Sequence, residues 1–178
     1  MSLELGAISM GYIADQVKAY FEEKGISTAI INLGGNVVVM GTSPNQENGW
    51  KVGVQDPDKI RGATVGYVHQ ANRSIVTSGI YERYIEVDGS IYHHILDPNT
   101  GYPVENDISG VTVFTDQSTD GDALSTSLFI FGIEEGLAYV NSLDGVEAVF
   151  IDKEHGVHLS EGLKDAFVLT NEEYHLAN

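Results

Sequence analysis

The spacing of apolar residues changes along the chain and predicts one helix, a series of strands, two more helices and closing strands. The segment 5–24 has its large apolar side chains at helical spacing, namely Ile13, Val17, Tyr20 and Phe21. The run 28–33 is continuously apolar and predicts a buried strand. Further runs have strand length, at 36–40, 50–55, 63–68, 74–77, 81–87, 90–94, 111–115, 146–151, 157–159 and 166–169. The two later helices are predicted at 123–131 and 134–142.

This order of elements predicts an α+β fold with a mostly antiparallel sheet and packed helices, rather than a doubly wound parallel sheet. The pair Asp88-Gly89 between two strand-like runs is typical of a tight hairpin turn. The sequence contains neither a dinucleotide-binding glycine fingerprint nor a P-loop pattern. Its 178 residues have the length of one domain, so we expect a single domain over residues 1–178.

The chain is strongly acidic, with a formal net charge of -17 and only nine Lys plus Arg. Nucleic acids and anionic membranes both attract basic surfaces, so neither is an expected partner. We expect an anionic ligand to bind through backbone amides or a divalent metal ion instead of a basic patch. The absence of cysteine excludes disulfides, thiolate metal sites and cysteine nucleophiles.

The stretch 120–126 holds the strongest candidate for chemistry, because it joins a strand-like run to an apolar helical run. Asp122, Ser125 and Thr126 are three and four residues apart, so a helix places them on one face. Free N–H groups at a helix start attract phosphate oxygens, and a carboxylate beside hydroxyls is a site of the kind that Mg²⁺ uses. The alternative is that Asp120 or Asp122 simply caps the helix.

Two adjacent histidines, His93 and His94, end the second strand of the predicted hairpin. Strand geometry points them to opposite sides, so only one of them is expected to reach a given cleft, where it would act as a general base. The alternative is that one histidine packs and the other is solvated. We interpret His155 and His158 as solvated, because no carboxylate stands at zinc-motif spacing from them.

Two glycine-containing segments are candidates for contact with a ligand. Gly34-Gly35 permits either a tight turn or the close approach of a ligand, and the turn alone explains it. In the segment 77–84, Tyr81 and Tyr84 are candidates for stacking on a ring, and Arg83 for pairing with an anion. The alternative for this segment is two tyrosines at the edge of the core and a surface salt bridge.

Five segments in this order, 5–15, 32–36, 77–84, 94–103 and 122–126, resemble the signatures of the ApbE family. These are the FAD:protein FMN transferases, formerly described as thiamine-biosynthesis lipoproteins. The resemblance extends over nearly the whole chain and implies a T-fold-like ApbE architecture. Family members are generally much longer, so we expect this chain to lack the family's N-terminal segment.

The resemblance implies a reaction in which FAD is bound with Mg²⁺, its pyrophosphate is split, and FMN is transferred to a Thr hydroxyl of a target protein with release of AMP. Some relatives instead hydrolyse FAD to FMN and AMP. A third alternative is a flavin-binding fragment without turnover. The family usually works outside the cytoplasmic membrane, often with a lipid anchor. The resemblance implies neither the identity of the acceptor protein nor an oligomeric state.

The resemblance also implies roles for individual residues. The implied metal ligands are the main-chain oxygen of Ala7, the carboxylate of Asp122, and the hydroxyl residues Ser125 and Thr126. His94 corresponds to the residue that activates the acceptor hydroxyl. The implied flavin contacts are Glu4, Met10 and the main chain of Leu96. The family usually carries Asp in place of Glu4 and often Lys in place of Met10.

Overall fold

Three α-helices, one short 3₁₀-helix (Glu161–Leu163) and three β-sheets form within residues 5–45 and 48–177, which the computed structural model describes. The helices are α1 (Ser9–Glu23), α2 (Ser118–Phe131) and α3 (Ile133–Val140). The main sheet contains β1 (Ala29–Asn32), β2 (Asn36–Met40), β5 (Arg73–Gly79), β8 (Ile108–Thr115), β9 (Glu147–Asp152), β10 (Gly156–Leu159) and β12 (His175–Leu176). The second sheet contains β3 (Trp50–Gln55), β4 (Thr64–Gln70) and β11 (Val168–Leu169). A separate hairpin pairs β6 (Tyr84–Val87) with β7 (Ser90–His93).

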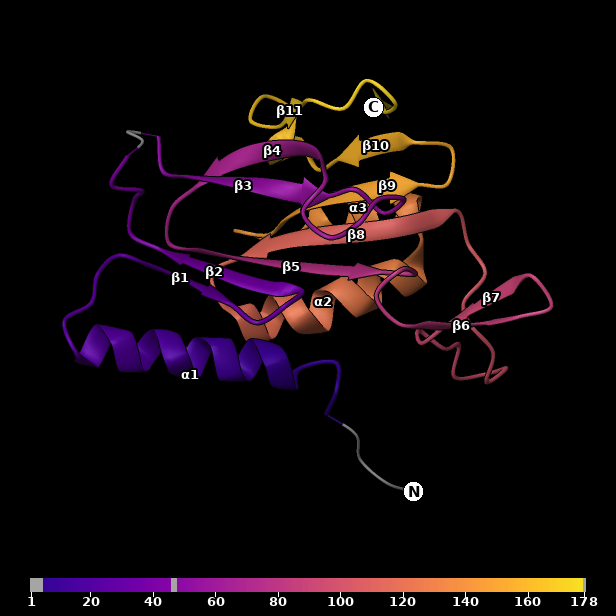
Figure 1. Ribbon diagram of the computed structural model, residues 1–178, viewed down its shortest axis with the longest axis horizontal. Helices are drawn as coiled ribbons and strands as arrows, with labels where there is room; N and C mark the ends of the chain where they lie inside the picture. Colours follow the sequence, from indigo (N-terminus) through magenta and orange to yellow (C-terminus); the bar gives the residue numbers. More distant parts are fainter. Residues whose placement is uncertain (1–4, 46–47, 178) are drawn as a thin grey trace.

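The main sheet lies between a layer of helices and the smaller sheet, and the β6–β7 hairpin projects away from this body (Figure 1). Its strand order is β1-β2-β5-β8-β9-β10-β12, and β10 and β12 are its one parallel pair among the described residues. The α+β prediction with a mostly antiparallel sheet is therefore confirmed. In the described part of the chain, no helix is long and apolar enough to cross a membrane.

Strand β8 is the centre of the molecule, because all eight of its residues are buried. Its side chains alternate between two hydrophobic clusters, as strand geometry requires. Phe114 packs into the cluster shared with the smaller sheet, whereas Val111 and Val113 pack with α2 and α3. Both faces of the strand are thus covered, and its end at Thr115 leads directly to the start of α2.

The structure corrects two predictions about individual elements. The run 28–33 was expected to be a buried strand, but β1 lies at the sheet edge, where Ile31 is buried and Ile30 is 52% exposed. The second helix was expected to begin at residue 123, but α2 begins at Ser118. Its first turn contains polar residues and a glycine, so the helical spacing of apolar residues becomes visible only later in the segment.

A carboxylate from α1 caps the start of α2, which explains how a helix forms there. The Asp15 side chain accepts hydrogen bonds from the N–H groups of Ser118 at 2.8 Å and Thr119 at 2.9 Å. It also accepts one from the Thr119 hydroxyl at 2.6 Å. The N-cap residue of α2, Gln117, makes no such side-chain bond. The cap therefore comes from a residue more than one hundred positions away in the sequence.

Replacing Asp15 with Ala is expected to lower the free energy of unfolding by about 1–2 kcal/mol, because it leaves the first N–H groups of α2 without their acceptor. Urea unfolding followed by circular dichroism measures the change. Glu22→Ala, which removes an exposed carboxylate from the same helix, serves as the control and should change stability by less than about 0.5 kcal/mol. Equal stabilities of the two variants would contradict the capping role.

Candidate functional site

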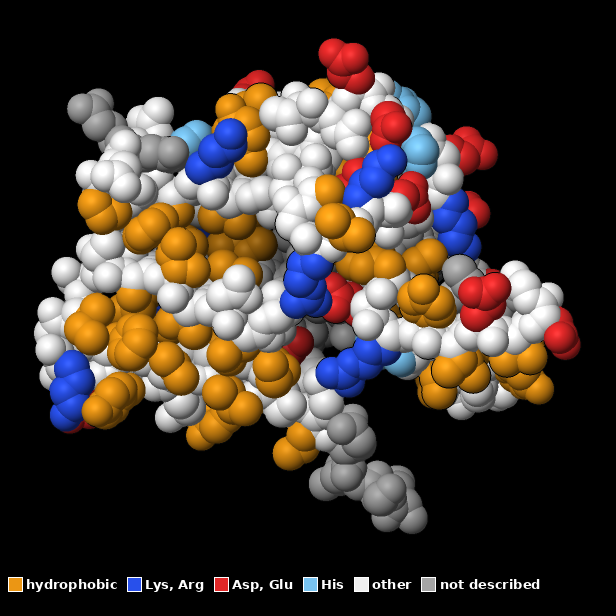
Figure 2. Space-filling model, viewed as in Figure 1, with side chains coloured by type: hydrophobic (Ala, Val, Ile, Leu, Met, Phe, Trp, Pro, Cys, Tyr) orange, Lys and Arg blue, Asp and Glu red, His pale blue; other side chains and the backbone are white. Residues whose placement is uncertain are grey.

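A cavity of about 520 Å³ opens between the start of α1, the β1–β2 turn, α2 and the residues that flank the hairpin. On the face shown in Figure 2, basic side chains gather beside the hollow between the main body and the hairpin. The predicted site residues that line this cavity are Ala7, Met10, His94, Leu96, Asp122 and Thr126. Segments that are far apart in the sequence therefore meet at one place. Glu4 lies outside the described residues.

Asp122 lies in the second turn of α2, so the prediction that it stands at the start of its own helix is wrong. Its carboxylate instead faces the start of α1 and accepts a hydrogen bond from the N–H of Gly11 at 2.8 Å. The N–H of Met10 and the side chain of Asn36 also bond to it. The carboxylate therefore does cap a helix, but the helix is α1. The start of α2, where free N–H groups were expected to attract an anion, lies at Ser118 instead.

Asp122 is 9% exposed as a residue, and the surroundings of its carboxyl act on its pKa in two directions. Burial raises the pKa above its usual value, because a charge is less stable away from water. The hydrogen bonds from Gly11, Asn36 and Met10 oppose that shift by stabilising the charged form. A cation placed beside this carboxylate would stabilise the same charged form.

The two hydroxyl residues after Asp122 lie in different environments. Thr126, one turn later on α2, lines the cavity beside Asp122. Ser125 is fully buried behind it, and its hydroxyl bonds to the Ser78 hydroxyl at 2.8 Å and to the main-chain oxygen of Asp122 at 3.0 Å. The structure thus brings Asp122 and Thr126 to the cavity wall, whereas Ser125 connects α2 to β5.

The two adjacent histidines point to opposite sides, as predicted. His93 is buried, packs edge-on against Phe129 and bonds through Nε2 to the main-chain oxygen of Val104, and burial lowers its pKa. His94 is exposed and lines the cavity. Its Nδ1 lies 3.1 Å from the main-chain oxygen of Arg83, which can only accept. Nδ1 therefore carries the proton in the neutral ring, and Nε2 is free to accept one.

The double glycine forms both a turn and part of the cavity wall. Gly34 has a φ of 87°, which suits glycine, and Leu33 N–H bonds to the Asn36 oxygen across the turn at 2.9 Å. Both glycines line the cavity, with Thr77 and Ser78 of the neighbouring strand β5. The turn is sufficient to explain why glycine stands at these two positions. Because glycine has no side chain, the two residues also leave space for a ligand in the cavity.

The cavity also contains positive charge, of which the sequence analysis considered Arg83 and missed Arg61. Two of the three arginines in the chain, Arg61 and Arg83, line it. Arg61 comes from the β3–β4 loop and forms an ion pair with Glu82 at 2.8 Å. The prediction that an anion would bind without a basic patch is therefore incomplete, because two of the few cations of this acidic chain line the cavity, beside the carboxylates of Glu82 and Asp122. Arg83 was a predicted candidate for pairing with an anion, with a surface salt bridge as the alternative, and the ion pair with Glu82 is made by Arg61 instead.

The interpretation as solvated is wrong for His158 and holds only in part for His155, whose side chain is 41% exposed. His158 bonds through Nε2 to Asp152 at 2.8 Å, and both side chains are mostly buried. This bond, with main-chain N–H groups, lowers the pKa of Asp152 against the opposing effect of burial. His155 bonds to Asp58 at 2.9 Å and packs on Tyr174. Both histidines hold the C-terminal part of the fold and do not line the cavity.

The residues at the cavity fit a small hard cation. Among the described residues, no group of three His, Asp or Glu side chains clusters as a metal site. The oxygen-bearing residues that line the cavity include Asp122, Thr126 and Ala7, and carboxylate, hydroxyl and main-chain oxygens are ligands of the type that Mg²⁺ prefers. Mg²⁺ commonly completes its coordination with water and ligand phosphates, so one carboxylate is sufficient.

Comparison with known proteins gives one consistent result. The ApbE family model matches residues 1–150. An FAD:protein FMN transferase of Klebsiella pneumoniae is 42% identical over 160 residues, and one of Treponema pallidum is 38% identical over 172. These alignments cover 90% and 93% of this chain, but 48% of each relative. The chain thus spans about half the length of the curated relatives that it matches.

Solved structures agree with the sequence comparison. The ApbE protein of Thermotoga maritima superposes with a TM-score of 0.82 at 31% identity, covering 93% of this chain and 53% of that protein. The flavinyl transferase ApbE of Pseudomonas stutzeri gives a TM-score of 0.70 at 30% identity, covering 95% of this chain and 49% of that protein. With the family match over residues 1–150, these likenesses establish that the chain belongs to the ApbE family.

Proposed function

We propose that this chain forms the metal-bearing part of a Mg²⁺-dependent FAD:protein FMN transferase. The observation that carries the proposal is a single cavity lined by Asp122 and Thr126 on one side and by His94, Arg83 and Arg61 from other elements. This arrangement combines a hard-cation site, a base and two cations. Relatives of this chain are named for transfer of FMN from FAD to a protein.

The transfer is a displacement at phosphorus, which requires neutralisation of the negative charge of the pyrophosphate and an aligned nucleophile. Bound Mg²⁺ would neutralise and orient the pyrophosphate, and Asp122, Thr126 and Ala7 would hold it. Arg83 lines the same cavity and adds positive charge, whereas the charge of Arg61 is partly compensated by Glu82. The remaining requirement is a group that takes the proton of the attacking hydroxyl.

His94 meets that requirement. Its Nδ1–H donates to the main-chain oxygen of Arg83, so Nε2 accepts a proton in the neutral ring. A Thr hydroxyl oxygen of the acceptor attacks the phosphorus of the FMN half, and the bond from this phosphorus to the bridging oxygen breaks. AMP leaves with the bridging oxygen, and the hydroxyl proton passes to His94. Atoms and charge balance without a further reactant.

One observation also favours a second function, the hydrolysis of FAD to FMN and AMP. His94 is exposed to solvent, so water reaches the same base that a protein hydroxyl would use. Release of free FMN without an acceptor protein, at a rate that an acceptor does not change, would identify a pyrophosphatase. Incorporation of FMN into protein at the expense of free FMN would identify a transferase.

Titration calorimetry of FAD with and without Mg²⁺ tests the proposed site on this chain. We expect FAD to bind in the presence of Mg²⁺ and to bind at least about tenfold more weakly without it, because the pyrophosphate charge is then less well neutralised. Ca²⁺ is a suitable control, since it prefers longer bonds and more ligands. FAD binding that is equal with and without Mg²⁺ would contradict the metal assignment.

Replacing His94 with Ala is expected to lower the rate of FMN transfer to an acceptor by about 10²–10⁴-fold, the usual contribution of a general base. Mg²⁺ affinity should stay within about twofold, because His94 is not among the proposed ligands. Single-turnover transfer and Mg²⁺ titration measure the two effects separately. A variant with weakened Mg²⁺ binding and normal transfer at saturating Mg²⁺ would assign His94 to the metal site instead.

A further inference from the structure

The β6–β7 hairpin has two distinct faces, because its strands pair only with each other in the described part of the chain. Residues directly opposite one another in an antiparallel pair lie on the same side, and the side alternates along each strand. The register therefore places Ile85, Val87 and Tyr92 on one face. Tyr84 and His93 lie on the other.

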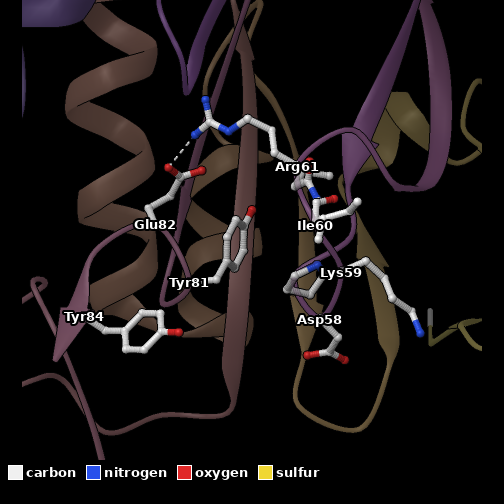
Figure 3. A pocket seen from close by; sticks show the side chains of 9 residues that line it. Asp58, Lys59, Ile60, Arg61, Tyr81, Glu82 and Tyr84 are labelled. Carbon is white, nitrogen blue, oxygen red and sulfur yellow. Dashed lines mark hydrogen bonds and ion pairs between the residues drawn. The ribbon is translucent and has the colours of Figure 1, made fainter. Parts of the chain in front are cut away.

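The face that carries Tyr84 and His93 is turned toward the body of the protein. His93 packs edge-on against Phe129 of α2. Tyr84 lines a second cavity of about 520 Å³, which also contains the ion pair between Arg61 and Glu82 (Figure 3). The side chains that line this cavity are mainly charged or polar, and the apolar residues of the opposite hairpin face are not among them.

The opposite face of the hairpin is apolar, exposed and continuous with the proposed base. The exposed fractions are 64% for Ile85, 49% for Val87 and 40% for Tyr92. The His94 N–H donates to the main-chain oxygen of Arg83 at 3.1 Å, which continues the register of the hairpin by one pair. His94 follows Tyr92 by two residues, so strand geometry places both on the same face. In Figure 2, hydrophobic side chains gather along the lower edge of the hairpin, beside the hollow.

This face has the features of a surface that binds an extended polypeptide. A two-stranded hairpin is marginally stable by itself in water, so it gains stability when a partner covers its apolar side. The outer edges of β6 and β7 have no strand partner among the described residues. Extended peptides bind such edges through main-chain hydrogen bonds, and their alternate side chains give specificity.

We propose that the acceptor polypeptide binds in extended conformation along this face, with an apolar side chain against Ile85 and Tyr92 and its hydroxyl residue at His94. The inference rests on the proposed transferase function and adds the chemistry by which the partner is recognised. The acceptor is the favoured occupant because its hydroxyl must reach Nε2 of His94, and the apolar face leads directly to that residue.

The spacing along the hairpin determines which position of the acceptor is apolar. The pair of Ile85 and Tyr92 lies two residues from the pair of Arg83 and His94, which is roughly 7 Å along the strands. Alternate residues of an extended peptide lie on one side and are also roughly 7 Å apart. An apolar residue two positions from the acceptor hydroxyl therefore fits against Ile85 and Tyr92, and one four positions away fits against Val87.

A series of labelled peptides tests this recognition by fluorescence anisotropy with the 178-residue chain, with and without FAD and Mg²⁺. Each peptide has a central Thr in a Gly/Asn background and a single Leu at one of the positions before or after it, and a reference peptide has no Leu. We expect Leu two positions from the Thr, on one side, to raise affinity about tenfold, because burial of most of one leucine side chain supplies that factor. Leu one or three positions away points to the other side of an extended chain and should raise affinity by less than about twofold.

Ile85→Thr and Tyr92→Thr, combined in one protein, should reduce the preference for this leucine to less than about threefold, because they remove most of the apolar contact while Thr keeps a high strand propensity. Tyr84→Thr is the matched control and should keep the preference, because Tyr84 is an exposed aromatic residue on the opposite face of the same strand. Circular dichroism verifies that the variants are folded.

Equal affinity for every Leu-containing peptide, or a preference that persists in the double variant, would overturn the inference. A second copy of this chain is the competing occupant, and sedimentation velocity detects it. Dimers that the double variant dissociates and that the peptides do not would assign the face to self-association, which would also overturn the inference. FAD binding with Mg²⁺ in the absence of peptide tests the proposed function separately. Peptide affinity without FAD requires no turnover, so it tests the hairpin face whether or not FAD binds.

Discussion

With the proposed function, replacing Asp122 with Asn is expected to reduce Mg²⁺-dependent FAD turnover by roughly 100-fold or more while leaving the fold intact. The loss of several kcal/mol of electrostatic stabilisation at the reacting phosphates corresponds to that factor. Asn keeps a side-chain oxygen that accepts the hydrogen bond from Gly11, which the wild-type carboxylate accepts at 2.8 Å. The substitution therefore removes the charge and retains the helix contact. Asp122→Ala should abolish turnover and also leave the Gly11 N–H without its acceptor.

The control for this prediction is Asp120→Asn, which neutralises an exposed carboxylate two residues earlier on the same helix. Rates at increasing Mg²⁺ and circular dichroism separate a lost cation from a lost fold. If Asp122→Asn and the wild-type protein turned FAD over equally, the metal assignment would have to be abandoned. An Asp120→Asn variant with the same defect as Asp122→Asn would show that total charge, rather than the position of the carboxylate, is responsible.

Replacing Gly11 with Ala is expected to lower the free energy of unfolding by about 3 kcal/mol or more, because α1 and α2 touch at this residue. A Cβ atom at Gly11 would lie 2.2 Å from the main-chain oxygen of Ser118 and 2.7 Å from the Cα of Thr119. Both contacts are to backbone, so no side-chain rotation relieves them, and the helices must separate. The hydrogen bond from Gly11 to Asp122 would break with them. FAD binding should weaken together with stability.

Urea unfolding measures this effect, with Gln16→Ala as the control at an exposed position of the same helix. Ala has a higher helix propensity than Gly, so an isolated helix would gain stability from Gly11→Ala. The expected loss of stability is therefore opposite in sign to the gain that helix propensity alone predicts. A Gly11→Ala protein as stable as the wild type would mean that the helices tolerate a wider separation.

The sequence alone was sufficient to predict the features that depend on residues close together in the chain. Asp88-Gly89 predicted the hairpin correctly because a tight turn depends on local backbone geometry. The opposite directions of His93 and His94 followed from strand geometry in the same way. The placement of Met10, Leu96 and Thr126 at one cavity followed from the resemblance to a known family, since their positions in the sequence are far apart.

The features that the sequence did not predict depend on long-range partners. The cap of α2 comes from Asp15, and the cap of α1 comes from Asp122, so neither helix start has a local signal. Arg61 was missed because the net charge describes the whole chain and contains no information about where the few cations gather. His158 was interpreted as solvated because its partner, Asp152, becomes its neighbour only when β9 and β10 form a hairpin.

The exchange of carboxylates between α1 and α2 has a consequence for how the protein folds. Each helix start depends on the other, and the residues that make the exchange are 103 and 111 positions apart in the sequence. Closing a loop of that length is entropically unfavourable and slow, so these contacts are expected to form late in folding. Because these contacts form late, the cavity is not even partly assembled in the unfolded chain. A ligand that binds there will slow global unfolding and protect strands far from it against hydrogen exchange.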